Sequence, residues 1–360
     1  MIELTQISQR YENRLQATGL RYGIIEVTSK CQLRCPGCYM VRRDALNKGE
    51  MTLEQAVRIL DLCRDYRGAE LETMDILGGE PLLWKPLKVY IEVLLRRGIK
   101  PWVFTNMVAI TAELATWLYE RKIHITGKLN IDPMCGGPEK GPLAGWGEWG
   151  LNLQSYAIGG SRPMAAKLFE GLYIFMSVGY RDPLFRVQNL IRRETKNGIR
   201  EYYEWCLENN VGTDLELMGN GEGVSPRDCM TVDRFTLLGI IADIQEIREQ
   251  HKLPPAEVLM PHLFGACPFY DKGLYFAVDG SIRACSNSTV TLAHVAVEEP
   301  IRKAYESPLI CNRLKLTRET VKGPCSTCHK WEKCRGGCRA TVEGMGNPFG
   351  SYPFCPVPLL

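Results

Sequence analysis

Apolar residues in the first two-thirds of the chain fall into short runs separated by longer amphipathic stretches. Short apolar or β-branched runs are typical of buried parallel strands. Such runs lie at Tyr22–Thr28, Leu71–Leu77, Trp102–Thr105, Ile123–Ile131, Phe185–Ile191 and Asp214–Met218. The amphipathic stretches predict helices at Thr52–Tyr66, Pro86–Arg97, Thr111–Glu120, Met164–Val178, Ile199–Asn209 and Val232–Gln250.

This alternation predicts an α/β fold. Six strand–helix units in series imply parallel strands joined by right-handed crossovers. An open (βα)6 partial barrel, similar to a TIM barrel, fits the pattern better than a sandwich. Local signals agree with it, because Thr52 and Gln55 are spaced as a helix capping box and Gly98 is placed to end a helix.

Two segments interrupt the rhythm. The connection Asp132–Arg162 is rich in glycine and long, and such loops are uncommon unless they are functional. It is either a lid over a substrate or a surface excursion. Near residue 255 the composition shifts, and Cys, Gly and Pro dominate after it. We therefore expect one domain over residues 1–255 and a smaller, cysteine-rich one over residues 256–360.

Charge and hydropathy exclude several classes of protein. The net charge is +3 and no basic run predicts a nucleic-acid surface. The N-terminus lacks the pattern of a signal peptide, and no apolar stretch is long enough to span a membrane. The sequence predicts a soluble, cytoplasmic protein without a nucleic-acid or membrane partner. In a reducing compartment, fifteen cysteines in clusters indicate metal binding more than disulfides.

The first cysteine cluster follows the first predicted strand. Cys31, Cys35 and Cys38 form the pattern CxxxCxxC. A short loop can present three thiolates to a [4Fe–4S] cluster, and without a local fourth thiolate one iron stays open. An open iron can bind a small molecule, as an open zinc position does. The alternatives are a zinc knuckle or buried free thiols, but zinc sites usually combine two such pairs.

This triplet resembles the signature of the radical S-adenosylmethionine (SAM) superfamily. The resemblance implies that the open iron binds SAM, and that reductive cleavage gives a 5′-deoxyadenosyl radical that abstracts hydrogen from a substrate carbon. It also implies an electron donor of the flavodoxin or ferredoxin type. The family's usual aromatic residue before the third cysteine is Gly37 here, and Tyr39 follows that cysteine instead, where it could pack near the adenine.

A second element supports the resemblance. Gly78, Gly79, Glu80 and Pro81 follow the second strand and resemble the family's GGEP motif, which binds the SAM amino group. Adjacent glycines let the backbone approach a ligand, and carbonyls with Glu80 can accept bonds from an ammonium. An ordinary strand-to-helix turn is the alternative.

Further polar residues follow the later strands, where barrel enzymes place their sites. The resemblance points to Asn106 and Asn130 as SAM-binding residues. Weaker candidates at equivalent positions are Arg192, Arg193, Glu216 and Asn220.

Seven C-terminal cysteines form a second pattern. Cys267 and Cys285 flank Gly280, the run CxxCx5CxxxC follows, and one more cysteine comes near the end of the chain. This spacing resembles the SPASM domain, and a zinc ribbon is the alternative. The resemblance implies two auxiliary [4Fe–4S] clusters, hence three in all. Its ligand sets would be Cys325, Cys328, Cys334 and Cys355 for the outer cluster and Cys267, Cys285 and Cys338 for the inner one.

The fourth ligand of the inner cluster stays undecided. Cys311 or His262 could close the cluster, or it could be open to substrate. Such clusters could accept the electron that leaves a substrate radical, or they could serve structure alone.

The sequence therefore predicts an oxidoreductase or epimerase that oxidises, epimerises or crosslinks its substrate. Cys135, in the long connection, is a hypothetical hydrogen donor for an epimerase. A peptide or sulfatase-type protein substrate and a small molecule such as a sugar or natural-product precursor are equally compatible with these residues. The rival classes are a non-catalytic electron-transfer protein and a zinc scaffold.

Overall fold

The computed structural model describes residues 19–36, 38–131, 148–217, 232–255, 267, 269–270 and 272–357, without the side chains of Arg42, Glu148 and Trp149. The long connection's residues 132–147 and the segments 218–231 and 256–266 lie outside the described residues. Among the described residues, no helix has the length and apolarity that a membrane span requires.

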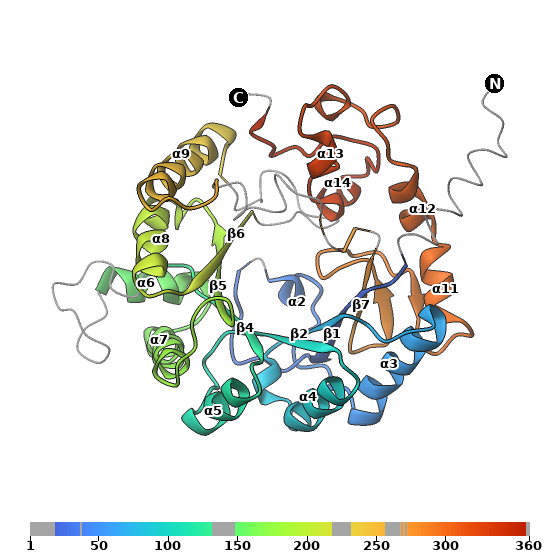
Figure 1. The fold of residues 1–360 in the computed structure, drawn as a ribbon, viewed down its shortest axis with the longest axis horizontal. Helices are drawn as coiled ribbons and strands as arrows, with labels where there is room; N and C mark the ends of the chain where they lie inside the picture. The colour runs from blue at the N-terminus through green and yellow to red at the C-terminus, as the bar shows by residue number, and fades with distance from the viewer. Residues whose placement is uncertain are drawn as a thin grey trace.

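A nine-stranded sheet organises the described chain, in the order β6-β5-β4-β3-β2-β1-β7-β8-β9. All neighbours from β6 to β7 are parallel. The six strands of the first two-thirds are β1 (Tyr22–Thr28), β2 (Thr73–Gly78), β3 (Lys100–Thr105), β4 (His124–Lys128), β5 (Phe185–Ile191) and β6 (Gly212–Leu217). The sheet curves without closing, so the predicted open partial barrel is confirmed (Figure 1).

Helices cover the convex face of this sheet (Figure 1). They are α3 (Leu53–Arg67), α4 (Leu87–Arg96), α5 (Ala112–Glu120), α7 (Arg162–Ser177), α8 (Ile199–Glu208) and α9 (Arg234–Gln250). The predicted capping box is present, since the Thr52 side chain accepts from Gln55 N and the Gln55 side chain accepts from Thr52 N. A short helix α2 (Tyr39–Arg42) lies on the opposite, concave side.

The apolar core lies between the sheet and these helices. Alternate strand residues such as Ile25, Ile76, Val103, Ile125 and Val187 are buried in it. The residues between them, such as Glu26, Asp75 and Lys128, therefore face the concave interior of the barrel, because successive side chains of a strand point to opposite faces.

The sheet continues into the cysteine-rich region. β7 (Gly273–Phe276) pairs in parallel with β1, and β8 (Ser281–Arg283) and β9 (Ala293–His294) extend the edge in antiparallel fashion. The helices of this region are α11 (Pro300–Tyr305), α12 (Pro308–Lys315), α13 (Trp331–Cys334) and α14 (Arg339–Gly344). Backbone hydrogen bonds thus join strands from both parts of the chain in one sheet, and the division into two domains near residue 255 stays a prediction.

The long connection differs from the expectation of an irregular loop. Helix α6 (Glu148–Ala157) occupies its second half and packs against α7. Gln154 of α6 accepts a hydrogen bond from Asn130 N just beyond β4 (3.1 Å), so α6 is anchored over the strand end. Its apolar positions could have been assigned to a helix from the sequence.

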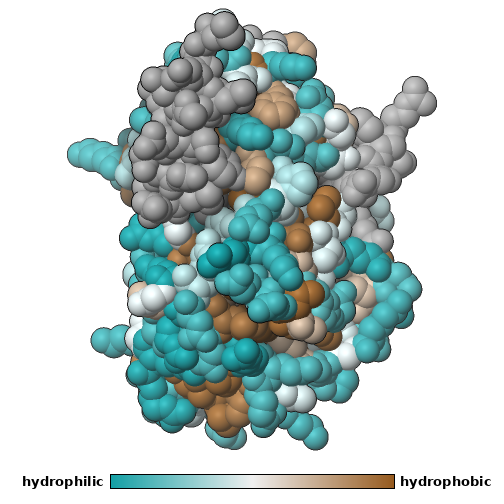
Figure 2. Space-filling view, turned by 90° about the vertical axis from the view of Figure 1, so that its right-hand side faces the viewer, coloured by the Kyte–Doolittle hydropathy of each residue, from teal (hydrophilic) through white to brown (hydrophobic). Residues whose placement is uncertain are grey.

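The outer surface has no dominant apolar region in the face drawn in Figure 2. Hydrophilic residues prevail there, and apolar ones interrupt them in small groups. Small exposed apolar groups are normal on proteins and need no partner.

Candidate active site

The cysteine triplet lies on a loop that the end of β1 fixes in place. Ser29 is buried, and its hydroxyl accepts from Lys48 N (2.8 Å) and Gly49 N (2.7 Å), which ties the start of the loop to the segment after α2. Cys31 N donates to Asn47 Oδ1 (3.3 Å) and Cys38 N to Cys35 O (3.0 Å). The loop is thus shaped by hydrogen bonds to the neighbouring backbone.

The three thiols lie within electrostatic reach of one another and form no disulfide. Burial raises the pKa of Cys31 to about 11, and burial with the neighbouring Cys38 and Cys31 raises the pKa of Cys35 to about 12. In the metal-free chain Cys31 and Cys35 are therefore neutral thiols. They become thiolates when a metal replaces the proton, because metal ligation is coupled to deprotonation.

The two glycines at the end of β2, Gly78 and Gly79, are required by close backbone contact with this loop. A Cβ on Gly78 would lie 2.2 Å from Thr28 O, and one on Gly79 would lie 2.3 Å from Lys30 O. Gly78 also has φ +147°. Gly79 N donates to Thr28 O (2.7 Å). The glycines thus let the motif approach the cysteine loop, a reason that the sequence analysis did not anticipate.

Glu80 ties the ends of β2 and β3 together. Its buried carboxylate accepts from Thr105 Oγ1 (2.7 Å), Asn106 N (2.7 Å) and Leu82 N (3.0 Å). Burial raises its pKa to about 7, and these three hydrogen bonds oppose that rise. The side chain therefore positions the strand ends, and its expected contact with the SAM amino group stays a prediction.

Asn106 lies against the first cysteine. Its Nδ2 is 3.7 Å from Cys31 Sγ, and its Oδ1 accepts from Gln32 Nε2 (3.1 Å) and Val108 N (3.0 Å). Hydrogen bonds to a ligating sulfur tune an iron–sulfur cluster. Asn106 thus lies beside Cys31, an expected cluster ligand, and its binding of SAM stays a prediction.

Buried donors without hydrogen-bond partners gather at the ends of β4 and β5. Within the described chain, Lys128 Nζ, Asn130 Nδ2, and Arg192 Nε and Nη1 have none, whereas Arg192 Nη2 donates to Pro36 O (3.0 Å). Burial and, after it, the Arg192 charge lower the pKa of Lys128 to about 7. Unpaired buried donors favour an anion. This part of the site fits the carboxylate of SAM.

Sequence reasoning missed Lys128 and undervalued Arg192. Lys128 ends β4 and Arg192 directly follows β5, and both act electrostatically on Cys35 and Cys38. For Lys128 the available signal was a cation inside the predicted strand Ile123–Ile131.

Tyr39 packs inside the barrel beside the motif. Its hydroxyl donates to Gly78 O (3.3 Å), and its ring contacts Tyr275 edge-on at 6.3 Å between centroids. The tyrosine therefore links the triplet to both the GGEP backbone and the cysteine-rich region. A place beside the adenine stays a prediction.

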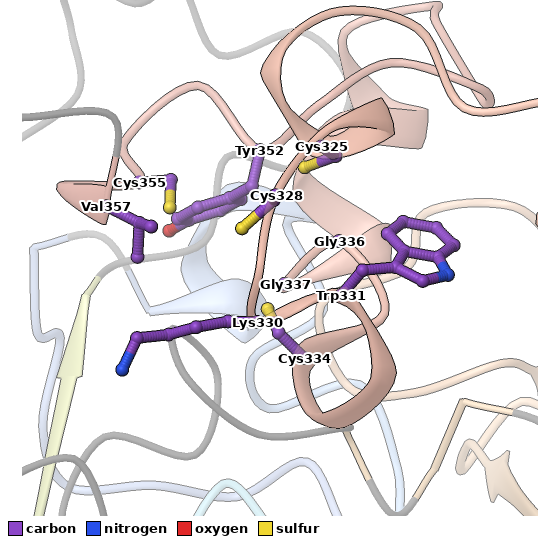
Figure 3. Close-up of a pocket in the computed structure, with 10 residues that line it drawn as sticks. All are labelled: Cys325, Cys328, Lys330, Trp331, Cys334, Gly336, Gly337, Tyr352, Cys355 and Val357. Carbon is purple, nitrogen blue, oxygen red and sulfur yellow. The ribbon is translucent and has the colours of Figure 1, made fainter. Parts of the chain in front are cut away.

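Four C-terminal cysteines line one pocket. Cys325, Cys328, Cys334 and Cys355 surround it together with Trp331 and Tyr352 (Figure 3). Burial and, to a smaller degree, the other three thiols raise the pKa of Cys355 to about 11. This group coincides with the ligand set expected for the outer cluster, and the pocket between the thiols suits a cluster.

The inner group is Cys267, Cys285 and Cys338. Burial raises the pKa of Cys285 to about 11, the Arg313 charge opposes this, and Cys338 and Cys267 reinforce it. The Cys311 thiol is turned toward the carbonyls of Glu306 (3.6 Å) and Tyr305 (3.9 Å), the residues just before its own helix α12. Its role as a fourth ligand stays a prediction.

Several expected site residues fall outside the described residues. They are Cys135, Asn220 and His262. Among the residues that the structure does describe, no three His, Cys, Asp or Glu side chains are grouped as ligands of a metal ion. The prediction of iron–sulfur clusters therefore rests on the cysteine pattern, the grouping of the thiols and the unpaired donors beside them.

The fold and the site define a radical SAM enzyme. Residues 25–131, which hold the triplet, the GGEP motif and Asn106, match the model of the Radical SAM superfamily. The chain is similar to this superfamily over these residues, and its cysteine-rich C-terminal region has the spacing of a SPASM domain.

A curated relative and two solved structures are similar along most of the chain. The PqqA peptide cyclase of Streptomyces rochei is 26% identical over 351 residues, which cover 92% of this chain and 88% of the relative. SuiB of Streptococcus suis bound to its precursor peptide SuiA matches with TM-score 0.67 and 16% identity, over 97% of this chain and 80% of SuiB. The enzyme anSMEcpe with bound AdoMet and a peptide matches with TM-score 0.63 and 15% identity, over 89% of each chain.

Proposed function

We propose that the protein is a peptide-modifying radical SAM enzyme that forms a crosslink within its substrate. The observation that carries this proposal is the joining of Cys31, Gly79 and Asn106 in one site, by the hydrogen bonds and close contacts described above. A peptide substrate is favoured over a small molecule because the relative in Streptomyces rochei is named a peptide cyclase and SuiB was solved with a precursor peptide.

The proposal assigns a task to each group of residues. Cys31, Cys35 and Cys38 hold a [4Fe–4S] cluster, and the motif from Gly78 to Pro81 binds SAM beside it. Lys128 and Arg192 pair with the SAM carboxylate, and Asn106 and Asn130 orient the rest of the molecule. When bound, cluster and SAM supply a 5′-deoxyadenosyl radical that removes hydrogen from a substrate carbon. The concave barrel face holds the substrate and excludes water from the reacting carbon.

The C-terminal cysteines hold the two auxiliary clusters in this proposal. Closing a carbon radical into a crosslink removes a second electron and a proton, so that the substrate loses two hydrogen atoms in all. The auxiliary clusters are suited to take up this electron because ligation and burial tune their potentials. We also place the enzyme in the cytoplasm, where thiols stay reduced.

Anaerobic reconstitution tests the proposal. The wild-type chain is expected to bind about twelve irons and to convert SAM to 5′-deoxyadenosine when dithionite is added. A variant with Cys31→Ala, Cys35→Ala and Cys38→Ala should keep about eight irons and release no 5′-deoxyadenosine. A wild-type chain that binds iron but leaves SAM intact would contradict the proposal.

The peptide part needs its own measurement. Short peptides encoded next to the gene are incubated with the reduced enzyme and SAM, and the product is analysed by tandem mass spectrometry. We expect a loss of two hydrogen atoms with fragment ions missing across the crosslinked segment. An unchanged mass with altered stereochemistry would indicate an epimerase and refute the crosslink.

A further inference from the structure

Arg43 connects the loop of the first cysteine triplet to the cysteine-rich region. It caps the C-terminus of α2, five residues after Cys38. Its Nη2 donates to Ser288 O (2.7 Å) and to Ser286 O, and both acceptors lie in the loop that follows Cys285. A single side chain from the radical SAM site thus holds the backbone beside an inner auxiliary cysteine.

The loop that Arg43 holds is a tight turn. Ser288 N donates to Cys285 O (3.2 Å), so the turn closes on the cysteine itself. Arg43 binds two further carbonyls of the same loop, those of Ser286 and Ser288. Turn carbonyls without a donor would adjust to another geometry, because buried polar groups require partners.

Two tyrosines keep the guanidinium in place. Arg43 Cζ lies 5.1 Å from the Tyr39 ring centroid and 5.8 Å from that of Tyr275. The Tyr275 hydroxyl donates to the buried Glu26 carboxylate on β1, which also accepts from Val278 N (3.4 Å). A planar guanidinium can stack on a ring and donate from its edge at once, whereas a lysine ammonium cannot do both.

We propose that Arg43 is a positioning residue that fixes the Cys285 loop, and with it the inner auxiliary cluster, relative to the radical SAM cluster. The proposal rests on the proposed function for the presence of that cluster, but the geometry of the loop is independent of it. The partner of Arg43 is part of this chain, so no ligand is needed to make the contact.

Arg248 offers a matched control. It also stacks over a tyrosine (Tyr203, 6.0 Å), donates to the Tyr203 hydroxyl (2.5 Å) and binds a backbone carbonyl, that of Pro254. Arg248→Met therefore removes a similar set of contacts from α9, at residues that do not adjoin any of the expected cluster cysteines in the sequence.

The first test uses the metal-free chain. Arg43→Met, Arg43→Lys and Arg248→Met are treated with iodoacetamide, and alkylation of Cys285 is followed by peptide mass spectrometry. We expect Cys285 to react several-fold faster in both Arg43 variants, because the freed loop opens more often, and at the wild-type rate in Arg248→Met. Should Arg43→Met misfold, Arg43→Lys keeps the charge and still lacks the stacked, two-acceptor geometry.

The second test measures the auxiliary cluster directly. In the background with Cys31, Cys35 and Cys38 changed to alanine, only auxiliary clusters contribute to the EPR spectrum after reconstitution. Arg43→Met is expected to shift the midpoint potential and the spectrum of the inner cluster, and Arg248→Met to leave both unchanged. If either measurement finds Arg43→Met equal to Arg248→Met, the inference is wrong. A background variant that binds no iron refutes the auxiliary clusters instead, and the alkylation test still decides the role of Arg43.

Discussion

At the scale of single residues, the Asp75 carboxyl group on the inner face of the barrel is buried, which disfavours its charged form. Asp75 on β2 lies between Ile24 of β1 and Trp102 of β3 in the strand register. Burial alone raises its pKa from 3.8 to about 7. The folded chain therefore keeps a proton that the unfolded chain has already released between these two pH values.

The sign of the resulting pH dependence follows from linkage. Stability falls as the pH rises wherever the folded state binds more protons. The metal-free wild type should therefore become less stable between pH 5.5 and 8. In Asp75→Asn we expect this decrease in the free energy of unfolding to be smaller by about 1–2 kcal/mol. The side chain keeps some exposure, so only part of the full shift should be seen. Urea unfolding at both pH values measures this.

Asp214→Asn is the control for this prediction. Asp214 also faces the barrel interior, but it is paired with Arg186 (2.8 Å), so its loss should destabilise the chain at both pH values. Parallel losses of stability with pH in wild type and Asp75→Asn would show that Asp75 ionises normally.

At the scale of elements, the strand ends depend on glycines that no side chain can replace. Gly79→Ala would place Cβ within 3 Å of the backbone of Lys30 and Ser29, and backbone cannot move aside cheaply. We expect a loss of about 1–3 kcal/mol and iron bound to the auxiliary sites only, with SAM left uncleaved. Thermal unfolding, iron content and 5′-deoxyadenosine check the three effects.

Gly239→Ala supplies the comparison. Gly239 lies in α9 with no atom within 4 Å of an added Cβ, so alanine should stabilise the helix by about 0.5–1 kcal/mol and leave iron content unchanged. If both variants lost the same amount of iron, the loss in Gly79→Ala would not be caused by displacement of the Cys31 loop.

Elements were also what the sequence predicted best. β1 and β5 begin and end where the apolar runs do, because each run is bounded by polar or turn residues. Gln154 escaped notice, since its role arises only when α6 meets the end of β4 in space. The grouping of Cys267 with Cys285 and Cys338 came from resemblance, and spacing alone could not have assigned it. The contact of Arg43 with Ser286 and Ser288 joins residues more than 240 positions apart and has no local signal.

At the scale of the whole molecule, β1 pairs with one strand that is close in the sequence and with another from the cysteine-rich region. β2 covers one edge, and β7 covers the other through the register Tyr22↔Gly273 to Ile25↔Phe276. During synthesis the second edge therefore stays open until residue 276 has left the ribosome. An apolar strand with an open edge is a template for aggregation. A chain stopped at residue 255 should accordingly be recovered in inclusion bodies, whereas the full chain, once β7 is made, shields the edge by its own backbone.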